Sequence, residues 1–323
     1  FTSRPVGDAM ATTIWGTSSS WTLTALPLFV WMGEILFRTK LSENLFKGLS
    51  PWMQKLPGGL IHVNVVGCAL FAAISGSSAA TVATVGKMSI PELRKRNYPE
   101  KILLGSLAGS GTLGLLIPPS IILIIYGVAV QESIAKLFIA GIIPGIMIAL
   151  IFMSYVIIWS LINKKSMPKI IEEYSFFEKI KRSKQLLPVI ILILAVIGSI
   201  YTGIATATEA ASLGVVGALI LSFFQKSLTL KTFKSSLLGA TKTSCMIAFI
   251  LAGSTFLSLA MGFTGLPRNL ALWIQNMELS PYVLIFVLMI FYIILGMFLD
   301  GISAVVLTMA IIEPMIRQAG FDT

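Results

Sequence analysis

Three carboxylates stand inside or at the edge of long apolar runs of the sequence, and they are the side chains best suited to hold an ion. They are Glu34, Glu209 and Asp300. A charged side chain in apolar surroundings is costly unless it is paired or binds an ion. Asp300 is the strongest candidate because it stands between Gly296 and Gly301, where free backbone carbonyls and one carboxylate can form an oxygen cage for a monovalent cation such as sodium. A helix-capping role is the alternative.

Glu209 and Glu34 have simpler explanations. Thr206 and Glu209 have the spacing of a helix N-terminus, where Thr caps the first turn and Glu favours the positive end of the helix dipole. Arg38 follows Glu34 by one helical turn, which predicts an ion pair on one helix face. We therefore expect capping at Glu209 and ion pairing at Glu34.

Two polar stretches interrupt apolar runs and indicate unwound backbone. Residues 75–81 (SGSSAAT) supply the hydroxyls and the backbone freedom of a turn. Residues 109–120 (GSGTLGLLIPPS) contain the adjacent Pro118 and Pro119, which remove backbone donors, and glycines that permit unwinding. Loose carbonyls and hydroxyls are what sodium coordination requires, and the N-termini of half-helices suit an anion. An ordinary helix with a serine-rich packing face and a proline kink that serves only shape are the alternatives.

The composition places these stretches in a membrane. The chain of 323 residues is 56% hydrophobic and only 12% charged, and its mean hydropathy is +0.89. These values exclude a water-soluble globule. The net charge of +10 does not indicate a nucleic-acid reader, because the basic residues lie in short loops between apolar runs. His62 is the only histidine, and Cys68 and Cys245 stand alone. The sequence therefore lacks the residues that a metal cluster or most catalytic groups require, and we do not expect an enzyme.

The alternation of apolar runs and basic loops predicts a polytopic helical membrane protein. The apolar runs lie at about 17–37, 60–86, 102–128, 135–162, 186–203, 209–225, 243–265 and 281–312. The loops that hold 20 of the 24 basic residues are 38–58, 87–101, 163–184 and 225–242. The positive-inside rule places these four loops in the cytoplasm.

This assignment makes the run that begins at residue 60 a re-entrant helical hairpin, because the loops on both sides of it are cytoplasmic. We expect the hairpin to span residues 60–93 with residues 75–81 at its tip. An offset of 223 residues superposes this hairpin on a second one at 281–318. The pairs that match at this offset are Ser77 with Asp300, Pro91 with Pro314, Arg94 with Arg317, and Tyr98 with Phe321. The two hairpins are predicted to enter from opposite faces, and inverted-topology repeats with broken helices are the architecture of secondary transporters.

The repeat predicts two domains. Residues 1–185 form repeat one, with the hairpin at 60–93, a broken helix at 102–128, a helix at 135–162 and a cytoplasmic linker at 163–185. Residues 186–323 form repeat two with the hairpin at 281–318. The same offset places counterparts of both repeats beyond residues 1–323, so we expect a complete protein of about 425 residues, truncated here at both ends.

At these residues the sequence resembles the large membrane subunit of the tripartite ATP-independent periplasmic (TRAP) transporters. The resemblance runs along essentially the whole chain. It is carried by residues 25–34 (ALPLFVWMGE), 75–81 (SGSSAAT), 111–120 (GTLGLLIPPS), 206–211 (TATEAA) and 296–301 (GMFLDG). It implies an elevator-type symporter in the bacterial inner membrane that takes an organic acid from a periplasmic solute-binding protein and moves it inward with sodium. It also implies a small membrane subunit as partner.

The resemblance further implies which residues form the sites. One ion site matches the first hairpin tip and the following broken helix, and another matches the second hairpin. The sodium ligands expected from this match are Ser75, Ser77, Gly111, Thr112, Asp300 and Gly301, and the expected substrate region contains Ser78, Pro118, Pro119 and Ser303. Sodium is the expected coupling ion, and no other cofactor is expected. We expect the family's second proline-containing broken helix and its opening helices outside residues 1–323. A channel or a scaffold subunit on the same fold is the alternative function.

Overall fold

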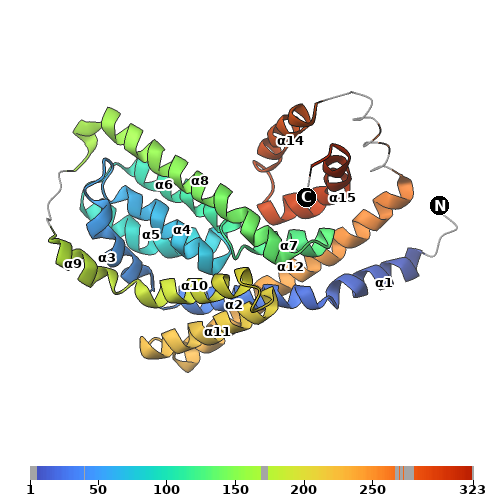
Figure 1. The fold of residues 1–323 in the computed structure, drawn as a ribbon, viewed down its shortest axis with the longest axis horizontal. Helices are drawn as coiled ribbons and strands as arrows, with labels where there is room; N and C mark the ends of the chain where they lie inside the picture. The colour runs from blue at the N-terminus through green and yellow to red at the C-terminus, as the bar shows by residue number, and fades with distance from the viewer. Residues whose placement is uncertain are drawn as a thin grey trace. The chain divides into compact units, whose positions relative to one another are not determined.

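The described part of the chain is helical throughout, as expected for a polypeptide that must satisfy its backbone hydrogen bonds in lipid. The computed structural model describes residues 6–39, 41–168, 174–265, 269, 272 and 280–321, and within these ranges it has α-helices and short 3-10 helices but no strand (Figure 1). Residues 40 and 169–173 of the predicted basic loops, and most of the connection predicted at 266–280, lie outside these ranges.

The helices in chain order have the following bounds: α1 Val6–Ser18, η1 Trp21–Thr24, α2 Ala25–Phe37, α3 Leu41–Met53, α4 Ile61–Ser75, α5 Ser78–Lys95, α6 Glu100–Gly111, η2 Thr112–Leu115, α7 Ile121–Val130, α8 Ile134–Ile162, η3 Lys164–Ser166, α9 Phe176–Ser183, α10 Leu187–Tyr201, α11 Ala207–Phe224, α12 Leu230–Thr264, α14 Pro281–Leu295 and α15 Gly301–Gln318.

Several of these helices are long and apolar enough to cross a membrane. Within the described residues, α8, α11 and α12 each reach that length alone, and two further pairs of consecutive helices reach it when each pair is counted as one span. The shorter apolar helices α4, α7 and α14 belong to the broken elements. The expected polytopic helical membrane protein is thereby confirmed.

The chain forms two compact units. The larger unit comprises Thr24–Leu123 and Ile134–Lys242, and the smaller unit comprises the first 23 residues, Ile124–Ser133 and Thr243–Thr323. Compactness and internal repetition are different properties, so the predicted repeat boundary between residues 185 and 186 stays a prediction. The larger unit contains the first hairpin and the broken helix as far as Leu123 in α7, and the smaller unit contains the rest of α7 and the second hairpin.

Small residues let the helices of the larger unit approach closely, as is usual between membrane helices. A Cβ on Gly214 of α11 would lie 2.5 Å from the sulfur of Met32 in α2. A Cβ on Gly33, the next residue of α2, would lie 3.0 Å from the Cα of Ser75 at the end of α4. Helix α2 therefore packs between α11 and the first hairpin.

Residues 60–93 form the expected hairpin and not one straight helix. Helices α4 and α5 lie side by side (Figure 1), and Gly67 of α4 faces Val85 of α5. At the open end of the hairpin, opposite the turn between α4 and α5, the backbone N–H of Leu60 donates to the hydroxyl of Tyr98 at 3.0 Å, and Tyr98 follows α5 in the chain. Both arms of the hairpin thus start from one end of the larger unit. That the hairpin is re-entrant in a bilayer stays a prediction.

Helices α14 and α15 form the second hairpin. Tyr292 of α14 and Thr308 of α15 are joined through their hydroxyls at 2.7 Å, and Leu284 and Met315 pack together near the open end. Adding the predicted offset of 223 to both bounds of α5 gives the bounds of α15, and Pro91 and Pro314 lie inside these two helices. The bounds of these two helices therefore agree with the offset, and the inverted-topology repeat itself stays a prediction.

The basic segment 225–242 differs from the loop that we expected. Helix α12 begins at Leu230 and continues into the apolar run. Thr229 and Thr232 explain this start, because the hydroxyl of each accepts a hydrogen bond from the other's backbone N–H, at 3.1 and 2.7 Å. Such reciprocal capping satisfies the free donors of a first helical turn.

Candidate functional site

The tip of the first hairpin is a tight turn between α4 and α5. Gly76 ends α4 with φ of 58°, a left-handed conformation that glycine adopts without strain, and its N–H donates to Ala72 at 3.1 Å. Ser77 is the N-cap of α5, and its hydroxyl accepts a hydrogen bond from Ala80 N–H at 3.5 Å. The sequence Gly-Ser therefore encodes both the end of one helix and the start of the next.

The helix that follows the hairpin is broken, as the sequence predicts. Helix α6 ends at Gly111, η2 forms one tight turn, and α7 begins only at Ile121. Between η2 and α7 lie Pro118 and Pro119, joined by a cis peptide bond, and neither can donate a helical hydrogen bond. The hydroxyl of Ser120 donates to the carbonyl of Leu115 and bridges the break.

The tip and the break contact each other directly. The backbone N–H of Ile121 donates to the carbonyl of Gly76 at 3.3 Å. A Cβ on Gly114 would lie 2.7 Å from the carbonyl oxygen of Ser77, and a Cβ on Gly76 would lie 2.8 Å from that of Pro119. The expected convergence of residues 75–78 with the unwound stretch is confirmed, and it is made by main-chain atoms.

A cluster of buried hydroxyls stabilises the tip. The hydroxyls of Ser75 and Thr81 lie 2.8 Å apart, and both contact the carbonyl of Ser77, at 3.3 and 2.7 Å. Ser75 is 5% exposed and Thr81 is fully buried. Hydroxyl and carbonyl oxygens are thereby gathered at one point of the larger unit, shielded from bulk solvent.

The four helix ends at this point carry opposite partial charges. Helices α4 and α6 with η2 end here, so their negative ends and free carbonyls face the junction. Helices α5 and α7 begin here, so their positive ends face it as well. The junction can therefore favour a cation and an anion in neighbouring positions.

The structure also shows residues whose role the sequence did not reveal. Gly114 and Gly33 permit the close backbone contacts with the tip, and Thr81 completes the hydroxyl cluster. Gly33, Thr81 and Gly114 all stand inside the motifs that carry the TRAP resemblance, and only this position in the sequence could have indicated them.

The predicted ligand Thr112 is exposed, and its hydroxyl donates to the carbonyl of Gly109 at 2.7 Å. Gly111 faces Val82 and the carbonyl of Ser78.

Asp300 is the N-cap of α15 in the smaller unit. One carboxylate oxygen accepts hydrogen bonds from the backbone N–H groups of Ile302 and Ser303, at 3.2 and 3.3 Å. The capping role that we weighed as the alternative is thus what the contacts show, and ion binding by Asp300 and Gly301 stays a prediction. Ser77 and Asp300, paired by the offset of 223, occupy the same N-cap position in their hairpins.

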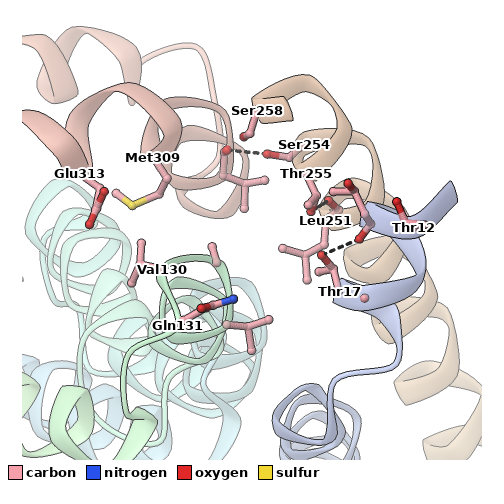
Figure 2. Close-up of a pocket in the computed structure, with 15 residues that line it drawn as sticks. Thr12, Thr17, Val130, Gln131, Leu251, Ser254, Thr255, Ser258, Met309 and Glu313 are labelled. Carbon is pink, nitrogen blue, oxygen red and sulfur yellow. Dashed lines mark hydrogen bonds between the residues drawn. The ribbon is translucent and has the colours of Figure 1, made fainter. Parts of the chain in front are cut away.

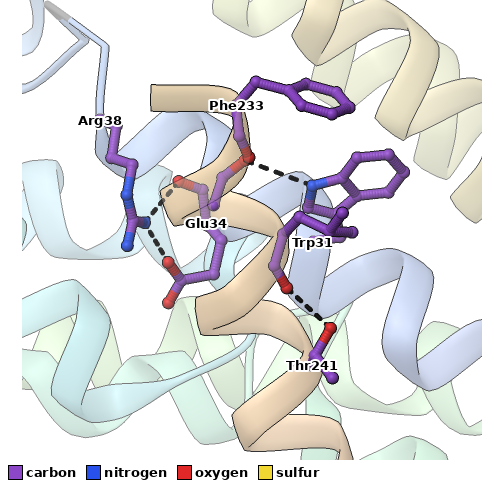
Figure 3. Close-up of polar contacts among 7 residues, drawn as sticks. Trp31, Glu34, Arg38, Phe233 and Thr241 are labelled. Atoms are coloured by element: carbon purple, nitrogen blue, oxygen red, sulfur yellow. Dashed lines mark hydrogen bonds and ion pairs between the residues drawn. The ribbon is translucent and has the colours of Figure 1, made fainter. Parts of the chain in front are cut away.

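The other two acids have the structural roles that we expected. Glu34 forms an ion pair with Arg38 on α2, beside α12 (Figure 3). Glu209 forms a capping box with Thr206, in which the Thr206 N–H donates to the Glu209 carboxylate at 2.8 Å. Both acids are therefore explained without an ion.

Charge pairing also fixes the connection between α5 and α6, which the sequence places outside the membrane. The Arg94 guanidinium donates to both oxygens of Glu100, and this hydrogen bonding holds the pKa of the Glu100 carboxyl below its ordinary value. In the described residues, His, Cys, Asp and Glu form no group of three that could hold a metal ion. Transition-metal chemistry thus has no visible ligand set in that part of the chain.

A cavity of about 610 Å³ lies within the smaller unit (Figure 2). Hydroxyls from α1 and α12 line it, among them Thr12, Thr17, Ser254 and Ser258. Glu313 of α15 also lines it, and its carboxylate forms an ion pair with Arg317. None of the predicted site residues lines it.

Comparison with known proteins connects this geometry to a family. The sequence model of the family described as "Tripartite ATP-independent periplasmic transporter, DctM component" matches residues 1–323. The C4-dicarboxylate TRAP transporter large permease protein DctM of Pseudomonas aeruginosa is 32% identical over 316 residues, which cover 97% of this chain and 73% of that protein.

Two further relatives bear other names. The sialic acid TRAP transporter large permease protein SiaM of Vibrio cholerae is 31% identical over 310 residues, which cover 95% of this chain and 71% of that protein. The isethionate TRAP transporter permease protein DctMQ of Oleidesulfovibrio alaskensis is 30% identical over 319 residues, which cover 98% of this chain and 49% of that protein. With its paired broken helices, its apolar spans and a family match along its whole length, the chain belongs to the DctM-component family of the tripartite ATP-independent periplasmic transporters and is a multi-pass membrane transporter subunit, not an enzyme.

Proposed function

We propose that this chain is the subunit through which an organic acid crosses the membrane together with sodium. The observation that carries the proposal is the contact between the first hairpin tip and the broken helix, where hydroxyls, free carbonyls and four helix ends meet. Broken helices that meet in this way form the substrate and ion sites of secondary transporters.

The first sodium site lies between the tip and the end of α6. Its ligands are the hydroxyls of Ser75 and Ser77 and the backbone carbonyls of Gly111 and Thr112, because the Thr112 hydroxyl already donates to Gly109. Oxygen atoms are the ligands of hard cations, and we expect sodium to oxygen distances of about 2.4 Å by analogy with calcium. The negative ends of α4 and α6 add to the attraction.

A second sodium site uses Asp300 and the backbone at Gly301. The cap hydrogen bonds occupy one carboxylate oxygen of Asp300. The other oxygen keeps its acceptor capacity, so capping and ion binding are compatible. The position corresponds to Ser77 in the first hairpin, and we therefore assign the two sodium sites to equivalent hairpin tips.

The substrate is an organic acid whose carboxylate binds at the positive ends of α5 and α7. Ser78 opens α5, and Pro118 and Pro119 lie just before α7, separated from its first residue by Ser120. Ser303 of the second hairpin stays a substrate-binding residue expected from the TRAP resemblance. The names of two relatives, a C4-dicarboxylate permease and a sialic acid permease, support this substrate class.

Transport follows an elevator mechanism with two partners. Main-chain contacts join the first hairpin to the broken helix, so the two can move as one body. We propose a small membrane subunit as one partner, a proposal that the name DctMQ of the isethionate relative supports. The other partner is a periplasmic solute-binding protein, in line with the family's description.

The chain lies in the bacterial inner membrane with its basic loops in the cytoplasm. Single cysteines in place of Lys47, Arg96, Lys179 and Lys231 should therefore react with thiol reagents only from the cytoplasmic side. Intact cells and inverted vesicles provide the two sides for labelling, and an intact-cell signal at any of these positions would contradict the orientation.

Reconstitution tests the function itself. The full-length protein, with its small subunit in proteoliposomes, should take up an organic acid only when a sodium gradient and the solute-binding protein are both present, and uptake should saturate. A potassium gradient of equal size is the control. Uncoupled current without saturation would instead favour a channel, and no flux with intact assembly would favour a scaffold subunit.

A further inference from the structure

A second cavity lies in the larger unit, away from the hairpin tip, at the open end of the first hairpin. Its volume is about 470 Å³. The lining residues that matter here are Gln54, Lys55, Gly59, Tyr98, Lys164 and Met167. All of them except Gly59, which follows residue 58, come from three of the segments that the sequence assigns to the cytoplasm, 38–58, 87–101 and 163–184, so the cavity stands where the membrane surface is expected.

The cavity is basic and contains donors without partners. Lys55 and Lys164 are both exposed, and neither forms an ion pair with another residue in the part of the chain that the structure describes. Gln54 is only 6% exposed, and its Nε2 has no hydrogen-bond partner there. A buried amide donor without a partner carries a free-energy cost that an acceptor bound in the cavity can remove.

The loop before α4 forms part of the cavity lining and packs closely against α8. Gly58 and Gly59 have φ of 104° and 55°, and a Cβ on Gly58 would lie 2.6 Å from a methyl group of Val156 in α8. Next to them, the Tyr98 hydroxyl accepts the Leu60 N–H at 3.0 Å. The cavity is therefore held open by close packing of the loop before α4 against α8.

The cavity lining includes the end of an apolar helix. Helix α8 is a candidate membrane span; its Leu161 lines the cavity and is 47% exposed, and Ile158 and Ile162, within one turn of Leu161, are 58% and 77% exposed. Lys164 follows this helix directly in the short helix η3. A ligand that places a negative group at Lys164 can thus lay an apolar chain along α8.

We propose that this cavity binds the phosphate headgroup of an anionic phospholipid of the cytoplasmic leaflet. Lys55 and Lys164 face the phosphate, Gln54 donates to its oxygens or to the glycerol, and the acyl chains follow α8. Basic pockets beside membrane helices on the cytoplasmic side are suited to such headgroups. A free phosphate ion shares the headgroup chemistry but gains nothing from the exposed isoleucines of α8, so the lipid is the occupant that the structure favours.

Native mass spectrometry of the full-length protein in detergent, with its small subunit, tests the proposal. Phosphatidylglycerol is the probe, and phosphatidylcholine and inorganic phosphate are the comparison ligands. The double variant K55Q/K164Q should bind phosphatidylglycerol roughly 30-fold more weakly than the unchanged protein, because each of the two lysines that line the cavity contributes roughly fivefold to headgroup binding and the two factors multiply. The control variant K165Q/K231Q removes equal charge from exposed positions outside the cavity and should leave binding within about twofold.

If the two double variants lost affinity for phosphatidylglycerol to the same extent, the proposal would be overturned, because lipid binding would then depend on net charge alone. Inorganic phosphate should bind more weakly than phosphatidylglycerol. If it binds equally strongly and its binding also requires Lys55 and Lys164, the cavity is a site for a free anion and the proposal is overturned. Equal affinity for phosphatidylcholine would also contradict it. If the double variant does not assemble, the single variants K55Q and K164Q should each weaken phosphatidylglycerol binding roughly fivefold, and unchanged binding in both would refute the assignment.

Discussion

Gly114→Ala should separate the hairpin tip from the broken helix by a single methyl group. The added Cβ would lie 2.7 Å from the carbonyl carbon and oxygen of Ser77 and 2.9 Å from the nitrogen of Ser78. These are main-chain atoms of the turn, so no side-chain rotation can relieve the overlap. Gly114 does not have a positive φ, so the conflict is purely steric.

The expected cost follows from overpacking in a region that cannot relax locally. Inserting a methyl group into well-packed structure destabilises by about 1–3 kcal/mol. Gly105→Ala is the matched control, because Gly105 lies in α6 and a Cβ there would meet no atom within 4 Å. Replacing an exposed helical glycine by alanine should stabilise by about 0.5–1 kcal/mol. The changes in the free energy of unfolding caused by Gly114→Ala and Gly105→Ala should therefore have opposite signs.

Two measurements check this prediction. Reversible unfolding of the purified proteins should show a lower free energy of unfolding for Gly114→Ala than for the unchanged protein. The free energy of unfolding of Gly105→Ala should be equal to or higher than that of the unchanged protein. Sodium activation of uptake by the reconstituted full-length protein should shift to higher sodium concentration only in Gly114→Ala, because the oxygens at the tip and on α6 move apart. Equal stability and equal sodium activation in both variants would refute the contact between the tip and the break.

Two further predictions concern helix caps. Asp300→Asn keeps a good N-cap residue but removes the charge, so stability should stay within about 0.5 kcal/mol while sodium activation of uptake weakens; an unchanged sodium curve at normal abundance would remove Asp300 from the ion site. Thr206→Val should lower the free energy of unfolding by about 1 kcal/mol, because it deletes the capping hydroxyl that Glu209 N–H contacts at 3.4 Å. Thr206→Ser retains the hydroxyl and should restore the loss, and a serine variant as unstable as the valine variant would contradict the capping role.

The sequence was sufficient for features that depend on local chemistry. The capping box at Thr206, the ion pair of Glu34, the hairpin turn at residues 75–78 and the break before Pro118-Pro119 each depend on a few neighbouring residues whose preferences are strong. The offset of 223 residues also relates the bounds and the internal prolines of α5 and α15, while the inverted repeat itself stays a prediction.

Long-range contacts between main chains were not predictable from the sequence. Gly33 and Gly114 act by lacking a side chain, and a glycine in a helix is equally compatible with simple flexibility. The orientation of the Thr112 hydroxyl toward Gly109 depends on where η2 begins, to within one residue. Helix α12 likewise starts earlier than the hydropathy profile indicates, because Thr229 caps it in a basic and polar segment.

The contacts that join the first hairpin tip to the broken helix are made by main-chain atoms. The Gly76 carbonyl and the Ile121 N–H keep this hydrogen bond whatever side chains surround them, provided that a residue other than proline follows Ser120. The joint therefore depends on the absence of side chains at Gly76 and Gly114, where a Cβ would meet main-chain atoms. Side chains beside the joint can change in size or polarity while the joint itself is kept.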